Sequence, residues 1–228
     1  MPVKIAGSSG REIEVAIPLG NLNLPGDLAV PARGVGLAIF AHGSGSSRHS
    51  PRNQAVARVL REFGIGTLLF DLLTDEEEQQ ELYTRYLRFD IPLLAERLVG
   101  ATRWVSEQAD ARGLPLGYFG ASTGAAAALA AAAKLGNRIR AVVSRGGRPD
   151  LAGDSLARVR TPVLLIVGGN DGAVIRMNER ARERLGGKSS LSLIPGASHL
   201  FEEPGALEEV AQLAGRFFLK YFHPGSER

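Results

Sequence analysis

The chain contains no cysteine among its 228 residues. This absence excludes a disulfide framework, a thiolate metal site and a cysteine nucleophile. Long apolar runs are also missing, because the longest, Ala125–Ala133, is far shorter than the roughly 20 residues needed to span a bilayer. Residues Met1–Gly10 lack the apolar stretch of a signal peptide. We therefore expect a soluble, cytoplasmic protein that makes no membrane contact.

An excess of one charge is missing as well. The 27 basic and 24 acidic residues leave a net charge of only +3, and the arginines are spread along the chain without a dense cluster. A nucleic-acid partner is therefore not expected. The hydrophobic fraction of 44% and the charged fraction of 22% are globular values. The length predicts a single domain over residues 1–228.

Short apolar runs alternate with segments of helical spacing. Runs of this length indicate strands that are buried on both faces, and hence a mostly parallel sheet between two helical layers. The predicted fold is thus a three-layer α/β/α sandwich. Its expected buried strands are Val35–Phe40, Thr67–Phe70, Pro115–Phe119, Ile139–Val143, Pro162–Val167 and Leu191–Ile194.

The N-terminal segment has a different pattern. Arg11–Leu19 alternates apolar and polar residues, which predicts a half-buried strand. Pro25-Gly26 is expected to break the strand pattern, and Leu28–Val30 is expected to form a second strand that pairs with the first as a hairpin. This pair would form an antiparallel edge of the sheet.

Capping signals mark the expected helices. Ser50-Pro51 places an N-cap before a proline at the first helical position, and Thr74–Glu77 reads as a capping box. The expected helices run from Pro51 to about Phe63, from Thr74 for a short acidic stretch, from Asp90 to about Gln108, over Ala125–Leu135, and from Pro204 or Gly205 to about Tyr221.

Polar, glycine-rich loops follow four of the expected strands. Ligands of open parallel sheets bind outside the carboxyl ends of the strands, so these loops are where the chemistry is expected. They are Ala41–Gly45, Gly120–Gly124, Gly168–Gly172 and Pro195–His199.

Gly120–Gly124, with the sequence Gly-Ala-Ser-Thr-Gly, fits the G-x-S-x-G nucleophile elbow. A strained strand-to-helix turn leaves no room for side chains two residues on either side of Ser122. In a chain with 28 glycines the pattern alone is weak, and a glycine-rich turn with a capping serine would look the same. The buried strand before it and the alanine-rich helix after it favour the elbow.

A serine nucleophile needs a base, which is usually histidine. His199 follows the last expected strand, in the chain order serine, acid, histidine that is typical of this architecture. His223 lies in the polar tail, and His42 is expected to hold its loop by hydrogen bonds rather than to act as a second base.

The third member is an acid that orients the histidine. Asp171 lies between Ser122 and His199 in sequence and directly follows a strand. A plain turn aspartate is the alternative. Asp150 is the second candidate for the acid, and Asp154 is a weaker one.

The loop after the first buried strand is expected to complete an oxyanion hole. Its donors would be the backbone N–H groups of Ser44 and of Thr123, the residue after the nucleophile. Four side chains near the expected mouth are candidates for substrate contacts, with a solvated helix start as the alternative: Arg48, His49, Arg52 and Arg145. The arginines among them make an anionic substrate worth testing.

With these residues in place, the sequence resembles the α/β-hydrolase superfamily over nearly its whole length. Gly169–Asp171, Gly196–His199 and the run Ala41–Asn53 are most similar to its dienelactone-hydrolase-like branch. The resemblance implies a Ser122, Asp171 and His199 triad. The enzymes that give the branch its name use a cysteine nucleophile, which this chain lacks. Ester chemistry by serine is therefore expected rather than dienelactone cleavage.

The resemblance also suggests where a lid would be. The segment between Val143 and Pro162 is too short for a substantial cap, so little or no cap is expected. Leu72–Phe89 is either a partial cover or an ordinary crossover helix. A shallow site predicts small or short-chain acyl substrates.

Taken together, the sequence predicts a serine hydrolase that cleaves a carboxylic ester or related acyl bond of a small molecule. No cofactor or metal is expected. The alternatives are an acyltransferase or perhydrolase with the same triad, and a non-catalytic binding module on the same fold. The oligomeric state is not indicated.

Overall fold

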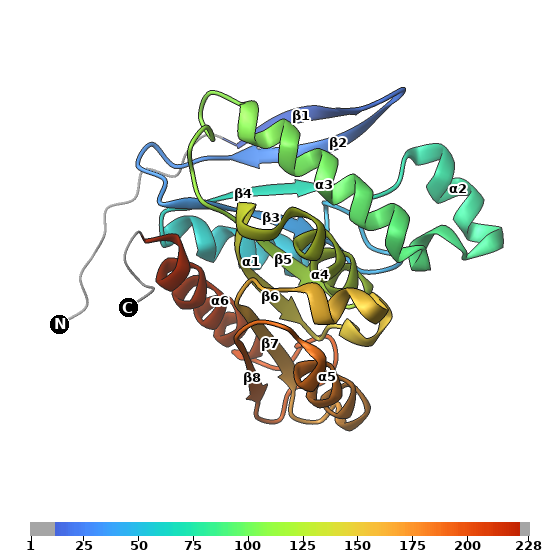
Figure 1. Ribbon diagram of the computed structural model, residues 1–228, viewed down its shortest axis with the longest axis vertical. Coiled ribbons are helices and arrows are strands. Elements are labelled where there is room, and N and C mark those ends of the chain that lie inside the picture. Colours follow the sequence, from blue (N-terminus) through green and yellow to red (C-terminus); the bar gives the residue numbers. More distant parts are fainter. Residues whose placement is uncertain (1–11, 224–228) are drawn as a thin grey trace.

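The computed structural model describes residues 12–223, which form one central sheet between two layers of helices (Figure 1). The strand order is β1-β2-β4-β3-β5-β6-β7-β8. The strands from β3 to β8 run parallel to one another. At the N-terminal edge, β2 is antiparallel to both β1 and β4. The strands are Glu12–Leu19 (β1), Leu22–Ala29 (β2), Gly36–Ala41 (β3), Ile65–Phe70 (β4), Leu116–Ala121 (β5), Ile139–Arg145 (β6), Val163–Gly168 (β7) and Ser189–Ile194 (β8).

Residues 12–223 contain six α-helices and three 3-10 segments, and all but α6, which follows β8, lie between strands. Helices α3, α4 and α5 pack on one face of the sheet and α1 and α6 on the other (Figure 1). The helical elements are Pro51–Glu62 (α1), Asp75–Thr84 (α2), Leu87–Phe89 (η1), Ile91–Glu107 (α3), Thr123–Leu135 (α4), Gly136–Arg138 (η2), Pro149–Arg158 (η3), Gly172–Arg184 (α5) and Ala206–Phe222 (α6). The predicted three-layer fold is confirmed.

The central strands are buried along their whole length. Every residue of β3, β4, β5 and β7 is buried, because helices cover both faces of the sheet. This double burial is the physical origin of the continuous apolar runs in the sequence. Within residues 12–223, no helix is both long and apolar enough to cross a bilayer.

The N-terminal edge differs from expectation. Pro25 and Gly26 lie inside β2 rather than interrupting it, and β2 begins at Leu22. Proline is tolerated because the pairing of β2 with β4 starts only at Gly26, opposite Phe70, so no ladder donor is needed from Pro25 on that side. Glycine suits position 26 because a side chain would be crowded there: a Cβ atom on Gly26 would lie only 3.1 Å from the Leu69 carbonyl oxygen. Arg11, the expected first strand residue, lies outside the described residues.

Two helical elements were not predicted from the sequence. Helix α5 follows Asp171 directly, and the 3-10 segment η3 occupies the connection between β6 and β7. Helix α5 has a charged sequence with few apolar residues, and η3 contains Gly153 with a non-helical φ of 54°. Both segments are nevertheless amphipathic, so the sequence does contain a helical pattern at each of them.

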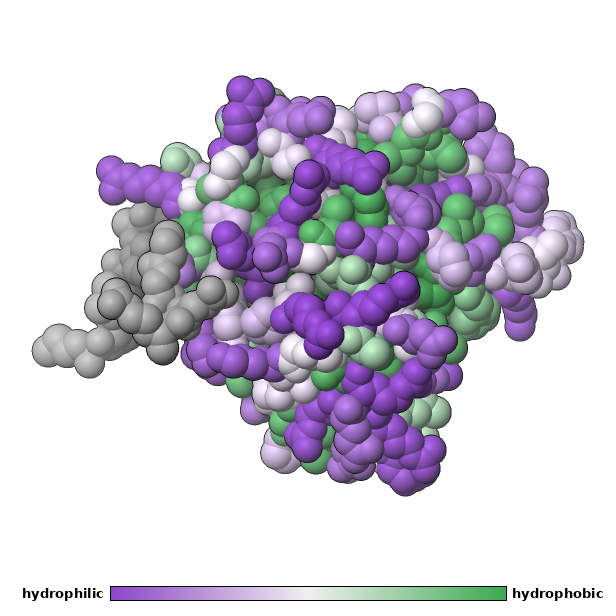
Figure 2. All heavy atoms as spheres, in the orientation of Figure 1, coloured by the Kyte–Doolittle hydropathy of each residue, from purple (hydrophilic) through white to green (hydrophobic). Residues whose placement is uncertain are grey.

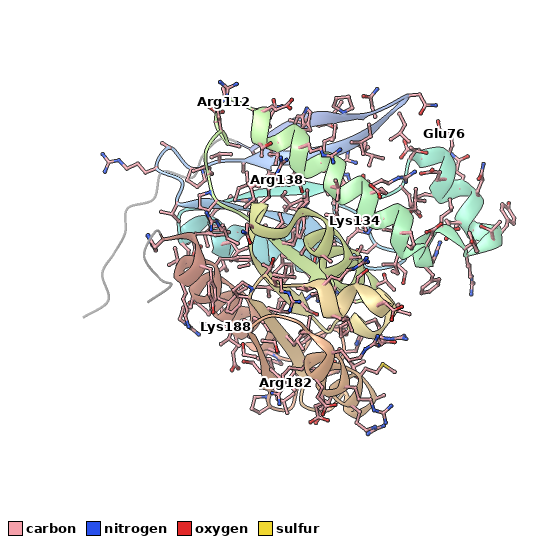
Figure 3. All side chains as sticks on the ribbon, in the orientation of Figure 1. Glu76, Arg112, Lys134, Arg138, Arg182 and Lys188 are labelled. Atoms are coloured by element: carbon pink, nitrogen blue, oxygen red, sulfur yellow. The ribbon has the colours of Figure 1, made fainter. Side chains whose placement is uncertain are left out.

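Helix α2 and η1 project from the body of the protein beyond the ends of β3 and β4 (Figure 1). Glu76 of α2 points away from the sheet (Figure 3). The buried carboxylate of Glu81 organises this segment by accepting N–H groups from Tyr86, Leu87 and Arg88. Four large apolar side chains of this segment are exposed, with Tyr83 the most exposed at 90%: Leu82, Tyr83, Tyr86 and Phe89. Pale and green spheres gather at this end of the molecule in Figure 2.

Candidate active site

Ser122 lies at the turn from β5 into α4, where its backbone is strained. Its φ of 50° and ψ of −120° lie in a region that non-glycine residues rarely adopt. The flanking glycines permit the turn. A Cβ on Gly120 would lie 2.5 Å from the Ala125 Cα atom, and one on Gly124 would overlap the carbonyl oxygens of Ala41 and His42. The G-x-S-x-G pattern is therefore a steric requirement of this elbow.

The backbone around Ser122 is tied to the loop after β6. The Ser122 N–H donates to the Arg145 carbonyl oxygen (3.2 Å), and the Ser122 carbonyl oxygen accepts the Arg148 N–H (3.0 Å). These bonds fix the serine at the carboxyl edge of the sheet, and they help to hold its strained conformation.

Asp171 and His199 form a short hydrogen bond. The His199 Nδ1 atom is 2.7 Å from Asp171 Oδ2. The other carboxylate oxygen, Oδ1, accepts the Val174 N–H at 3.4 Å as the N-cap of α5. The helix start thus orients the carboxylate, and a proton held on Nδ1 leaves Nε2 free to act as a base. The His199 side chain is 40% exposed, so a substrate or water can reach it.

The two alternative acids are engaged elsewhere. Both oxygens of Asp150 accept from the guanidinium of Arg148, at 2.9 and 2.8 Å. Asp154 is exposed and pairs with Arg184 at 3.4 Å. Of the three candidates, Asp171 is therefore the carboxylate that contacts His199.

The loop after β6 also brings Ser122 and His199 together. Gly146 follows Arg145, whose carbonyl oxygen binds the Ser122 N–H. A Cβ on Gly146 would lie 3.2 Å from the His199 carbonyl oxygen and 3.6 Å from His199 Cε1. Within residues 12–223, no hydrogen bond joins the Ser122 hydroxyl to the imidazole. Catalytic hydrogen bonds of this kind are often long without substrate.

The oxyanion loop departs from expectation in one contact. Gly43 lies closest to the nucleophile, since a Cβ there would be 3.1 Å from Ser122 Cβ. The Ser44 N–H, which was expected to be available for an oxyanion, donates to the buried hydroxyl oxygen of Thr123 at 2.8 Å. Thr123 therefore holds this loop against α4 through its side chain.

His42 is buried and holds the same loop from the other side. Its Nδ1 atom is 3.0 Å from the Gly43 carbonyl oxygen, and its Nε2 accepts the Leu72 N–H at 3.0 Å. These partners require a neutral ring with the proton on Nδ1. Burial lowers the pKa of His42. The expected structural role of His42 agrees with these contacts.

The four candidates for substrate contact separate into two groups. Arg48 is paired with Asp71, Asp27 and Glu14, so its charge is already neutralised at the β1–β2 edge. His49 is exposed, and its N–H donates to the Ser47 hydroxyl at 3.2 Å.

Arg52 and Arg145 have fewer partners. The Arg145 guanidinium makes one long hydrogen bond, to Asn53 Oδ1 at 3.4 Å. In the part of the chain that the structure describes, Arg52 pairs only with the exposed carboxylate of Glu202, at 3.3 Å. These two arginines, unlike Arg48, retain unused donors beside the catalytic elbow.

The projecting α2–η1 segment reaches the oxyanion loop. Glu78 and Arg88 line a small recess together with Ser44, Thr123 and Leu72, which favours a partial cover over the alternative of an ordinary crossover helix. A larger hollow lies at the opposite, amino end of the strands, near Leu116 and Arg138, remote from Ser122. No group of three or more potential metal-ligating side chains occurs in the part of the chain that the structure describes.

Sequence reasoning missed two supports of the histidine loop. The Glu203 carboxylate accepts the N–H of Ser198, next to His199, at 3.0 Å. The Phe201 side chain is buried. Its backbone has a φ of 57°, which is unusual for an aromatic residue. The sequence contains no signal for either, because both depend on how the loop folds back onto β6 and α6.

The sheet order, the elbow after β5 and the acid and histidine loops after β7 and β8 together define an α/β hydrolase. No protein-family model matches the chain. A solved dienelactone hydrolase from Anabaena variabilis is 57% identical, with 93% of this chain and 99% of that chain covered and a TM-score of 0.91. On this similarity, the chain belongs to the dienelactone hydrolase family.

Two further comparisons frame this result. A dienelactone hydrolase-like promiscuous phosphotriesterase from metagenomic libraries shares the fold at 18% identity, with a TM-score of 0.75 and coverage of 95% of this chain and 100% of that one. Proteins of two Mycobacterium tuberculosis strains, provisionally named phosphoribosyl transferases, are 56% identical over 211 residues. That match spans 92% of this chain but only 47% of each of theirs.

The buried neutral state of His42 predicts a pH-dependent stability. Because its pKa is lowered in the folded protein, the unfolded state binds more protons at acidic pH. His42 therefore supports full stability above about pH 6.5, and this contribution decreases as the pH falls below that value. The loss has a limiting slope of about 1.4 kcal/mol per pH unit. Urea unfolding between pH 7.5 and 5.5 should show a shallower pH dependence for His42→Gln, whose amide is neutral throughout. Equal slopes in the two proteins would contradict this role.

Proposed function

We propose that this protein is a serine hydrolase that cleaves a carboxylic ester or related acyl bond of a small substrate. The observation that supports this most strongly is the 2.7 Å bond between Asp171 and His199, placed at the same sheet edge as the strained Ser122 elbow. Membership of the dienelactone hydrolase family supports hydrolytic chemistry in general. The absence of cysteine makes serine the nucleophile.

In the first half-reaction, the Ser122 hydroxyl oxygen attacks the acyl carbon while His199 Nε2 accepts its proton. Asp171 stabilises the imidazolium and keeps the ring oriented. The Thr123 N–H, at the start of α4, donates to the oxyanion that develops on the former carbonyl oxygen. The bond to the leaving group then breaks, and His199 returns the proton to the departing alcohol. An acyl-enzyme on Ser122 remains.

In the second half-reaction, His199 takes a proton from water, whose oxygen attacks the acyl carbon. Collapse of the second tetrahedral intermediate releases the carboxylic acid and returns the proton to Ser122. A Ser44 N–H contribution to the oxyanion hole requires that the substrate replace its bond to the Thr123 hydroxyl. The partial cover by α2–η1 fits substrates with a short acyl part.

Phosphoribosyl transfer is not carried over to this chain. The name belongs to mycobacterial proteins about twice as long as the segment that matches. The match covers 92% of this chain, and the site described above needs no residue from the rest of the longer proteins. We therefore assign acyl hydrolysis to this segment and leave the transferase name with the longer proteins.

Hydrolysis of p-nitrophenyl acetate tests the three assigned roles. We expect Ser122→Ala to lower kcat by about 10⁴-fold or more, because the nucleophile is lost. Asp171→Asn should lower kcat by roughly 10³- to 10⁴-fold through the wrong histidine tautomer, while asparagine still caps α5. Steady-state kinetics of the purified variants provides both numbers.

Asp150→Asn is the matched control for the acid. It removes the same charge from the carboxylate that pairs with Arg148, and it should retain activity close to that of the unchanged protein. If Asp150→Asn lost activity while Asp171→Asn kept it, the acid of the triad would be misassigned. Undiminished hydrolysis by Ser122→Ala would refute the proposed mechanism, and a complete lack of ester hydrolysis would favour a non-catalytic module.

The Thr123 hydroxyl provides a test of the oxyanion loop. Thr123→Val keeps the shape of the side chain but removes the acceptor of the Ser44 N–H. We expect kcat to fall about 10-fold, the effect of one lost hydrogen bond on loop position, with little change in KM. Thr123→Ser restores the hydroxyl and should recover most of the rate. Full activity of Thr123→Val would mean that the loop does not depend on this bond.

A further inference from the structure

Arg145 is a buried cation with few acceptors. It lies at the carboxyl end of β6, and only 7% of its surface is exposed. A guanidinium carries five N–H donors, yet within residues 12–223 the Arg145 side chain makes a single hydrogen bond, of 3.4 Å, to Asn53, and its Nε has no partner there. No carboxylate of residues 12–223 lies within ion-pair distance of it. Burying a charge without a counterion is unfavourable by several kcal/mol.

The surroundings of Arg145 are also positive. Arg52, in the first turn of α1, has a buried Nε without a partner. Burial and the charge of Arg52 lower the pKa of Arg145 to about 10. The 12-residue helix α1 starts at Pro51, so its N-terminal dipole adds partial positive charge at the same place. Among residues 12–223, the carboxylate that pairs with this cluster is that of Glu202, which contacts Arg52 from an exposed position.

This positive cluster lies against the catalytic residues. The Arg145 carbonyl oxygen binds the Ser122 N–H. The Arg145 guanidinium carbon is 5.9 Å from the centre of the Phe201 ring, two residues after His199. Gly146 then contacts the His199 backbone. The guanidinium therefore lies beside the loop that carries His199, at the same carboxyl end of the sheet as Ser122.

We propose that Arg145, Arg52 and the N-terminus of α1 form a subsite for an anionic group, a carboxylate or a phosphate, carried by the substrate. The subsite rests on the proposed function, since it names the class of ester that the Ser122 site takes. A bound anion would supply both the missing acceptors and the missing counter-charge. Water could supply acceptors, but it would leave the two like charges unneutralised. Arg48, whose charge is already paired, is not part of the subsite.

Two esters of similar size separate charge recognition from catalysis. Mono-p-nitrophenyl succinate carries a free carboxylate, whereas p-nitrophenyl butyrate is neutral. We expect a higher kcat/KM for the succinate half-ester in the unchanged protein. Arg145→Met and Arg52→Gln should each reduce the ratio of kcat/KM for the succinate half-ester to kcat/KM for butyrate about 10-fold or more.

Arg58→Gln is the matched control, because it removes the same charge from an exposed position on the same helix. It should leave the ratio of the two rates unchanged. Arg52 is more exposed than Arg145, with 36% of its side chain accessible, so Arg52→Gln remains informative if Arg145→Met does not fold. An equal loss for both esters, or no loss for either, would overturn the subsite.

Calorimetry with non-hydrolysable anions tests binding without catalysis. Succinate and inorganic phosphate are titrated into Ser122→Ala, and into Ser122→Ala combined with Arg52→Gln. Binding that the second change weakens about 10-fold or more supports the subsite, and the stronger ligand identifies carboxylate or phosphate as the preferred group. Binding of neither anion, or binding unaffected by Arg52, contradicts it. Because this assay requires no turnover, it remains decisive even if ester hydrolysis fails.

Discussion

The site depends on one steric constraint, the close approach of α4 to the ends of β3 and β5. Gly124 is in contact with the backbone of Ala41 and His42, and Gly120 with that of Ala125. This contact forces Ser122 into a backbone conformation that serine otherwise avoids. It also places the first amides of α4 beside the nucleophile. The strain is compensated by the surrounding sheet, whose central strands are buried on both faces.

Around this elbow, each catalytic loop is held by a contact from a different element. Asp171 is oriented by the start of α5, and the loop of His199 is anchored by Glu203. His42 and Thr123 hold the oxyanion loop from opposite sides. The fold therefore fixes three loops, separate in sequence, at one edge of the sheet, where a nucleophile, a base and an oxyanion site are required together. The unneutralised charge of Arg145 stands out because the other buried charged side chains of residues 12–223, Glu81 and Arg97, each have an ionic partner.

Much of this arrangement could be predicted from the sequence. The buried strands and the elbow follow from local patterns that have direct steric or solvation causes, such as the glycines at positions 120 and 124. The order of Ser122, Asp171 and His199 identified the chemical candidates. Local sequence patterns did not predict features that depend on contacts between residues far apart in the chain. The β2 strand contains Pro25 because of where its pairing with β4 begins, and Ser44 is engaged by a threonine far along the chain. The difference between Arg48 and Arg145 depends on which carboxylates the fold brings near each of them.

The central claim is that the strained elbow makes Ser122 a nucleophile that His199 activates. Reaction with a fluorophosphonate, followed by intact-protein and peptide mass spectrometry, tests it most directly. The account predicts one adduct per chain, located on Ser122, and much slower labelling of a His199→Gln variant. Absence of an adduct, or labelling at another residue at an unchanged rate in that variant, would contradict the account.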